Sequence, residues 1–218
     1  GINNWFTIDK VIISGKMQHV SVGELSATAK ERVRGNLFTL DINELQNYFQ
    51  QVPWVNRISI TRGFPDSIIV GVSEHDAVAR LANVGLISAE GDIFNGADVE
   101  SGLPVFYVAE DNISDAMDDN KSINEILQHR QVRVADLTIN GLGITKISLS
   151  NNLKVVICGA DIESQVNLLD QYWDKLYAIN ANLNYVNMCY KNALAINAPK
   201  TISSAPVVKK STAKRSKT

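Results

Sequence analysis

Apolar residues recur at two different spacings along the chain, and the change in spacing divides it into two segments. In the first segment, the apolar positions of residues 42–52 form one helical stripe that ends before Pro53. Ser21 and Glu24 have the spacing of a capping box, which predicts an earlier, shorter helix over residues 25–33. The first segment is therefore expected to contain two helices.

Strands are predicted on both sides of this helical pair. β-Branched residues indicate a strand over residues 6–13 that ends at a turn, and a hairpin over residues 58–72 whose loop contains Gly63 to Asp66. The first segment should therefore run strand, helix, helix, strand, strand.

In the second segment, short strands separated by turn residues dominate. Two helices interrupt them, a modest one over residues 122–130 and a clear one over residues 161–177 that begins at the N-cap Asp161. This pattern predicts an α+β fold whose second domain is a mainly antiparallel β domain with flanking helices. We expect domains at 1–80 and 81–198, followed by a disordered basic tail at 199–218. The predicted strands are 78–81, 85–88, 105–108, 137–140, 144–149, 153–158, 185–190 and 194–197.

Charge is distributed unevenly along the chain. The last ten residues carry five cations and no acid, so the formal net charge of −2 becomes −7 for residues 1–208. The tail could contact anionic lipid or nucleic acid, but a solubilising run is the favoured interpretation. No apolar stretch reaches the roughly 18 residues of a membrane-spanning helix, so we interpret the chain as a soluble fragment of a longer protein.

The chain offers little that could perform catalysis or hold a metal or cofactor. His19, His75 and His129 lie far from other ligand residues, which favours surface histidines over a zinc site. Five acids between residues 110 and 119 lack the spacing of a calcium loop, and a solvated loop is favoured there. No activated nucleophile is recognisable, so we expect neither an enzyme nor a cofactor.

The two cysteines, Cys158 and Cys189, are too few for a disulfide framework. One disulfide is possible in an oxidising compartment, but two separate buried thiols are the favoured interpretation.

Several short motifs follow one another in a specific order along the chain. The hairpin residues Phe64-Pro65-Asp66 and the following residues 72–80 are similar to the W-P-D-x-L-x-V and V-x-E-x-x-P-V-A-R patterns of the FtsQ/DivIB family of bacterial cell-division proteins. Residues 53–55 match its P-W-V, residues 87–94 are similar to its V-D-x-x-G-x-V-F, and residues 185–196 are similar to its Y-V-D-L-R-Y-x-x-G-x-A-V. In the last motif, Asn187, Cys189 and Ala193 replace the usual Asp, Arg and Gly.

The resemblance implies a POTRA domain followed by a β domain, in a non-catalytic scaffold of the divisome. It implies a single-pass inner-membrane protein whose periplasmic part lies at the septum and whose transmembrane helix is missing from this sequence. The implied partners are FtsB and FtsL, with no nucleic acid, and the implied outcome is regulation of septal peptidoglycan synthesis. A POTRA-bearing component of an outer-membrane assembly or secretion system is the alternative, and a cell-wall enzyme is the remaining one.

Two candidate binding surfaces follow from this resemblance. The last strand should be a sheet edge, to which a segment of FtsB could add as a further strand. Tyr190 would be its aromatic anchor, although a core-facing strand residue is an equally good interpretation of this tyrosine. The proposed FtsB-binding residues are Tyr190, Asn192, Ala193, Leu194, Ile196 and Ala198. The proposed recruitment residues are Arg57, Ile60 and Arg62.

Overall fold

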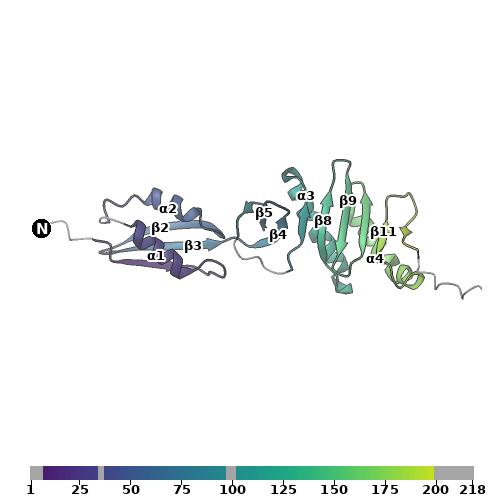
Figure 1. Ribbon diagram of the computed structural model, residues 1–218, viewed down its shortest axis with the longest axis horizontal. Coiled ribbons are helices and arrows are strands. Elements are labelled where there is room, and N and C mark those ends of the chain that lie inside the picture. The colour runs from purple at the N-terminus through teal and green to yellow at the C-terminus, as the bar shows by residue number, and fades with distance from the viewer. Residues whose placement is uncertain (1–6, 34–36, 97–101, 199–218) are drawn as a thin grey trace, which may run out of the picture.

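The computed structural model describes residues 7–33, 37–96 and 102–198, and contains two sheets that follow one another along the molecule (Figure 1). The N-terminal sheet has three strands and the second sheet has nine. The basic tail predicted from residue 199 onward lies outside the described residues, and so does Phe6.

The N-terminal domain has the predicted order of strand, helix, helix, strand, strand. The oxygen of Ser21 accepts a hydrogen bond from the Glu24 backbone N–H, and Asp41 caps the second helix through the Glu44 N–H in the same way. β1 pairs in parallel with β3, and β2 pairs antiparallel with it, so the sheet order is β1-β3-β2. The elements are β1 (Lys10–Ser14), α1 (Val22–Arg32), α2 (Ile42–Gln50), β2 (Val55–Gly63) and β3 (Ser67–Glu74).

The second sheet has the order β12-β11-β10-β9-β8-β7-β4-β5-β6. Most neighbouring pairs are antiparallel, whereas β4 with β7, β7 with β8, and β10 with β11 are parallel. The prediction of a mainly antiparallel β domain is confirmed. Its strands are β4 (Ala77–Leu81), β5 (Gly85–Ser88), β6 (Ile93–Phe94), β7 (Val105–Tyr107), β8 (Val134–Ile139), β9 (Ile144–Leu149), β10 (Lys154–Cys158), β11 (Tyr185–Asn187) and β12 (Ala195–Ile196).

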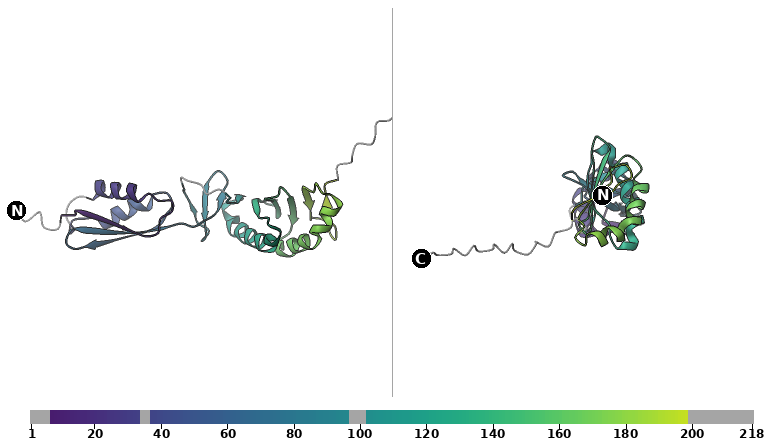
Figure 2. Two further views of the ribbon diagram at one scale, coloured as in Figure 1. Left: turned by 90° about the horizontal axis from the view of Figure 1, so that it is seen from below. Right: turned by 90° about the vertical axis from the view of Figure 1, so that its right-hand side faces the viewer.

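Two helices, α3 (Ile113–Leu127) and α4 (Ile162–Ile179), cover one face of this sheet (Figure 2). The prediction for α4 is confirmed, including its N-cap Asp161, and the helix ends two residues later than expected. Its buried stripe joins α3 and the strands in one core cluster. Short 3₁₀ turns flank α3 at Glu110–Asn112 and Gln128–Arg130.

The prediction of a solvated acidic loop at residues 110–119 is wrong, because most of it belongs to α3. Ile113, Ala116, Ile123 and Leu127 are buried along one side of this helix, and the acids occupy its other positions. The many carboxylates obscured this apolar spacing in the sequence. The helix is therefore amphipathic and begins about nine residues before the predicted start at Ser122.

The side chain of Asp119 is an exception among these acids because it is half-buried. Burial, together with the charges of Asp115 and Asp118, raises the pKa of Asp119 to about 6. Its folded-state pKa lies above its unfolded value, so the stability associated with this group is present at low pH. It is lost as the pH rises from about 4 through 6.

Replacing Asp119 by asparagine should therefore stabilise the protein at neutral pH and not in acid. After a discount for solvent screening, we expect the free energy of unfolding to rise by about 1 kcal/mol at pH 7.5, with little change at pH 4. Urea unfolding at both pH values measures this difference. Asp111→Asn, a change on the exposed 3₁₀ turn, is the control. An equal change in the free energy of unfolding at both pH values would contradict the raised pKa of Asp119.

Arg130 connects the end of α3 to α4. Its guanidinium donates to the carboxylates of Asp170 and Asp174 and lies 5.3 Å from the ring centroid of Trp173. Burial alone would raise the pKa of the Asp170 carboxyl, but hydrogen bonds from Arg130 and His129 outweigh it and hold that pKa below its usual range. This network fixes the two covering helices against each other.

The two domains meet at a stack of aromatic and imidazole rings. The Trp54 ring is 3% exposed and lies between His19, with ring centroids 3.7 Å apart, and Phe94 of the second sheet. His75 stacks on the ring of Phe94, with ring centroids 4.3 Å apart. His19 and His75 are therefore half-buried at the junction, and the surface prediction is correct only for His129. The two imidazoles are partly buried by ring contacts with Trp54 and Phe94, which are distant in sequence, so the local pattern does not reveal them.

Candidate functional site

β12 forms one outer edge of the nine-stranded sheet, as the sequence predicted for the last strand. At the opposite edge, β6 lies against the N-terminal domain, since Phe94 packs on Trp54 and the Asn95 carbonyl accepts the Trp54 N–H at 3.0 Å. One edge of the sheet is thus covered by the other domain, whose described residues lie at the opposite end of the sheet from β12.

The backbone groups of Ile196 point away from the sheet. In an antiparallel pair, the N–H and C=O of alternate residues point to the same side. The Asn197 N–H donates to the Tyr185 carbonyl at 3.3 Å, so Asn197 points toward β11. Ile196, opposite Val186, therefore presents its donor and its acceptor to the outside. This arrangement can receive one further strand.

Asparagine side chains hold this short strand in place. Asn180 is buried at the end of α4, and its Nδ2 donates to the Asn197 carbonyl at 3.0 Å. The Asn197 Oδ1 accepts from the backbone N–H groups of Asn184 and Tyr185, and its Nδ2 donates to the Asn182 carbonyl. These supporting residues were missed in the sequence. Their signal is the cluster of asparagines between residues 180 and 197.

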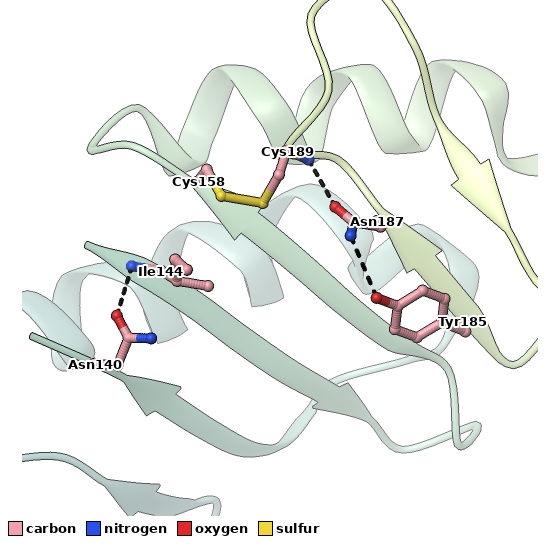
Figure 3. Close-up of a disulfide and its surroundings, with 6 residues drawn as sticks. All are labelled: Asn140, Ile144, Cys158, Tyr185, Asn187 and Cys189. Carbon is pink, nitrogen blue, oxygen red and sulfur yellow. Dashed lines mark hydrogen bonds between the residues drawn. A yellow bond between two sulfur atoms is a disulfide. The ribbon is translucent and has the colours of Figure 1, made fainter. Parts of the chain in front are cut away.

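A disulfide joins Cys158, at the end of β10, to Cys189, just beyond β11 (Figure 3). The favoured prediction of two separate thiols is therefore wrong. The helical crossover α4 returns the chain parallel to β10, which brings cysteines 31 positions apart in sequence to a Cα–Cα distance of 4.9 Å. The parallel register of the two strands, which the sequence pattern did not reveal, is the physical reason for the pairing.

Asn187 shapes the turn that follows β11. Its Oδ1 accepts the Cys189 backbone N–H at 2.9 Å, and its Nδ2 donates to the Tyr185 hydroxyl at 3.3 Å (Figure 3). Asparagine can form this local turn as aspartate does, because either side chain offers the oxygen that accepts the N–H two residues on. Together with the disulfide, this bond fixes the start of the connection from β11 to β12.

Tyr190 lies on that connection rather than in a strand. Its side chain is 58% exposed, so the core-facing interpretation is wrong. Asn192, which has a φ of 58°, turns the chain back, and Ala193 is exposed. Leu194 and Ile196 pack partly against the core, and Ala198 is exposed. The six residues predicted for this site thus form one continuous segment from the turn to the edge strand.

The three predicted recruitment residues share the strand β2 but not one face of it. Ile60 packs partly against the N-terminal core, whereas Arg57 has the opposite parity and is exposed. The Arg62 guanidinium donates to the carbonyls of Leu37 and Leu40, so it holds the connection between α1 and α2. The structure therefore gives Arg62 a role within the domain that the sequence did not predict.

The outer edge of β2 is also partly occupied. The side-chain amides of Gln46 and Gln50, on α2, donate to the carbonyls of Ile58 and Asn56 at 3.0 and 2.6 Å. These acceptors are unavailable to a further strand. The β12 edge is therefore the better candidate for strand addition.

Within the described ranges, no cluster of three or more His, Cys, Asp and Glu side chains could hold a metal ion. Among the helices of the same ranges, none is long and apolar enough to cross a membrane.

Two family models match consecutive parts of the chain. Residues 6–75 match the POTRA domain of FtsQ type, and residues 77–188 match the C-terminal domain of cell division protein FtsQ/DivIB. The boundary between the matches falls next to the ring stack at the junction of the two sheets.

Relatives named cell division protein FtsQ align with most of the chain. Cell division protein FtsQ of Neisseria gonorrhoeae is 26% identical over 195 residues, which are 89% of this chain and 81% of the relative. FtsQ of Nitrosospira multiformis is 24% identical over 183 residues, 84% of this chain and 77% of the relative. FtsQ of Allochromatium vinosum is 27% identical over 202 residues, which are 87% of this chain and 77% of the relative.

Proposed function

The chain belongs to the FtsQ/DivIB family of cell division proteins, and from this we propose that it is a non-catalytic scaffold of the divisome that binds FtsB and FtsL. Its role in cell division follows from the family. In our proposal it links early and late division proteins and regulates septal peptidoglycan synthesis through those partners. The observation that carries the binding role is the outward-facing backbone of Ile196 on the β12 edge.

We further propose that the chain is the periplasmic part of a single-pass inner-membrane protein located at the septum. The disulfide between Cys158 and Cys189 supports this placement, because such bonds persist in the oxidising periplasm and are rare in the cytosol. The domains would be a POTRA domain at 1–80 and a β domain at 81–198, followed by the tail at 199–218. The strand β4 (Ala77–Leu81) spans this proposed boundary and pairs within the second sheet.

In the proposed mechanism, an extended segment of FtsB pairs with residues 192–198 and becomes a tenth strand of the sheet. Main-chain hydrogen bonds at Ile196 would supply register, and side chains of the preceding turn would supply specificity. Asn180 and Asn197 keep β12 in its extended form before the partner arrives, which lowers the entropy cost of binding. FtsL would join through its association with FtsB.

Tyr190 is the proposed anchor of this interface, because an exposed aromatic ring beside an open edge can be desolvated by a partner. Replacing Tyr190 by alanine should weaken binding of an FtsB segment by about ten-fold or more. Isothermal titration calorimetry with the folded variant measures the dissociation constant.

Two matched variants separate the contribution of the Tyr190 ring from that of its hydroxyl group and from the general effect of removing an exposed tyrosine. Tyr190→Phe keeps the ring and should retain most of the affinity. Tyr107→Ala removes a tyrosine of similar exposure, 52% against 58%, from β7, away from the edge, and should leave affinity unchanged. An unaltered dissociation constant for folded Tyr190→Ala removes the anchor role.

We propose a second, separate surface for recruitment to the septum, on β2 at Arg57, Ile60 and Arg62. Since Arg62 also holds the α1–α2 connection, the informative variant changes only Arg57 and Ile60, to glutamate and threonine. This variant should lose septal localisation while its purified form keeps full affinity for FtsB. Fluorescence microscopy of a tagged full-length protein gives the readout, and normal septal localisation would eliminate this surface.

A further inference from the structure

Two phenylalanine side chains are exposed together at one end of the POTRA domain. Phe38, in the connection between α1 and α2, is 65% exposed, and Phe64, in the β2–β3 turn, is 64% exposed. Their ring centroids are 6.1 Å apart. We call this pair the aromatic tip.

The aromatic tip is held in position by buried neighbours rather than by the two rings alone. Leu37, adjacent to Phe38, is fully buried, and its carbonyl accepts a hydrogen bond from the Arg62 guanidinium at 2.7 Å. At the other side of the tip, the Ser67 hydroxyl closes the hairpin turn on the Gly63 carbonyl at 2.8 Å. These contacts fix the backbone of the two loops that carry Phe38 and Phe64.

The tip lies where the described part of the chain begins. The backbone N–H of Asp9 donates to the carbonyl of Asp66, two positions after Phe64, at 2.8 Å. β1 then runs parallel to β3, away from the hairpin turn and toward the second domain (Figure 1). A membrane anchor preceding residue 7 would therefore reach the domain at the aromatic tip.

We propose that the aromatic tip inserts into the surface of a lipid bilayer and orients the POTRA domain on it, an inference that rests on the proposed membrane attachment. Aromatic rings gain free energy in the interfacial region of a bilayer. The two rings that the described residues place at this tip are too few for an independent protein interface, which typically buries more than about 1,000 Å². They suffice when a covalent anchor already holds the domain near the surface, because the second contact is then intramolecular.

The test uses the full chain attached to vesicles through an N-terminal histidine tag and a nickel-chelating lipid. The vesicles consist of phosphatidylcholine and phosphatidylglycerol, with or without bromine on the acyl chains, which quenches nearby tryptophan. Phe64→Trp supplies the probe at the tip. Leu142→Trp supplies the matched control, because Leu142 is 85% exposed on the β8–β9 turn of the other domain. Subtraction of the parent chain's signal removes the contribution of its own tryptophans.

Brominated lipid should quench roughly half of the fluorescence added by Phe64→Trp and little of that added by Leu142→Trp. Phe38→Trp provides a second probe of the same tip, so the result does not depend on one variant folding. Equal, weak quenching at positions 38, 64 and 142 would overturn the proposal. If these positions stay unquenched while Phe38→Ser/Phe64→Ser loses a protein partner in pull-downs, the tip is a protein contact and the lipid proposal is wrong. The tag imposes attachment, so neither outcome depends on FtsB binding or on a natural anchor.

Discussion

Replacing Ile196 by proline should lower the affinity for an FtsB segment about 30- to 100-fold, because proline removes the outward N–H and its ring blocks an added strand. The Ile196 N–H does not contribute to the β11–β12 pairing, whereas that of Asn197 does. The substitution should therefore leave the sheet intact. Titration calorimetry gives the affinity, and circular dichroism reports the fold.

Ile196→Val is the matched control for this prediction. It keeps the backbone donor and a β-branched side chain, so its affinity should stay within about two-fold of the parent. An unchanged affinity for Ile196→Pro would show that the partner does not pair with β12. Equal losses in both variants would instead assign the energy to the isoleucine side chain.

Removing the disulfide should have the largest effect on stability. The bond between Cys158 and Cys189 closes a loop across 31 positions, and the loss of chain entropy in the unfolded state predicts a contribution of about 3–4 kcal/mol. The Cys158→Ser/Cys189→Ser variant should therefore unfold at markedly lower urea concentration. Fluorescence of Trp173, in the core of the second domain, follows this transition.

The reducing agent dithiothreitol supplies the control. It should destabilise the parent by the same amount and leave the double serine variant unchanged. Because both cysteines belong to the second domain, unfolding of the N-terminal domain should shift much less. Identical urea midpoints for the oxidised and reduced parent would contradict this assignment.

The N-terminal domain could be predicted almost completely from local patterns. The capping residue Ser21 precedes α1, the stop at Pro53 follows α2, and the alternation around Ile58 and Ile68 marks the hairpin. Each of these signals acts within a few residues of the element that it defines. The ring stack of Trp54 and Phe94 could not be predicted, because it joins residues from two sheets.

The second domain shows where local patterns fail. α3 was predicted too short because its four carboxylates equal in number the four residues of its buried stripe and hide their spacing. The pairing of Cys158 with Cys189 depends on the parallel register of β10 and β11, which is set across a helical crossover. The strands β6 and β12 have only two residues each, too few to show a sequence pattern, and they form by pairing with β5 and β11.

The edge position of the last strand was predicted from the sequence, but the contacts that build this edge were not. The last strand of the chain was expected to form a sheet edge, and β12 does so. The exposure of Tyr190 and the support of Asn197 by Asn180 depend on side-chain contacts that no local pattern encodes. For the same reason, the hydrogen bonds of Arg62 to the α1–α2 connection could be found only in the folded domain.

The most direct test of the proposed scaffold role is amide hydrogen exchange at Ile196, measured by NMR with and without a saturating FtsB segment. Strand addition predicts that the Ile196 N–H, which points outward in the free protein, exchanges at least about ten-fold more slowly in the complex. The Asn197 N–H, already bonded to the Tyr185 carbonyl, should change less. Binding of the segment with no slowing at Ile196 would contradict the account.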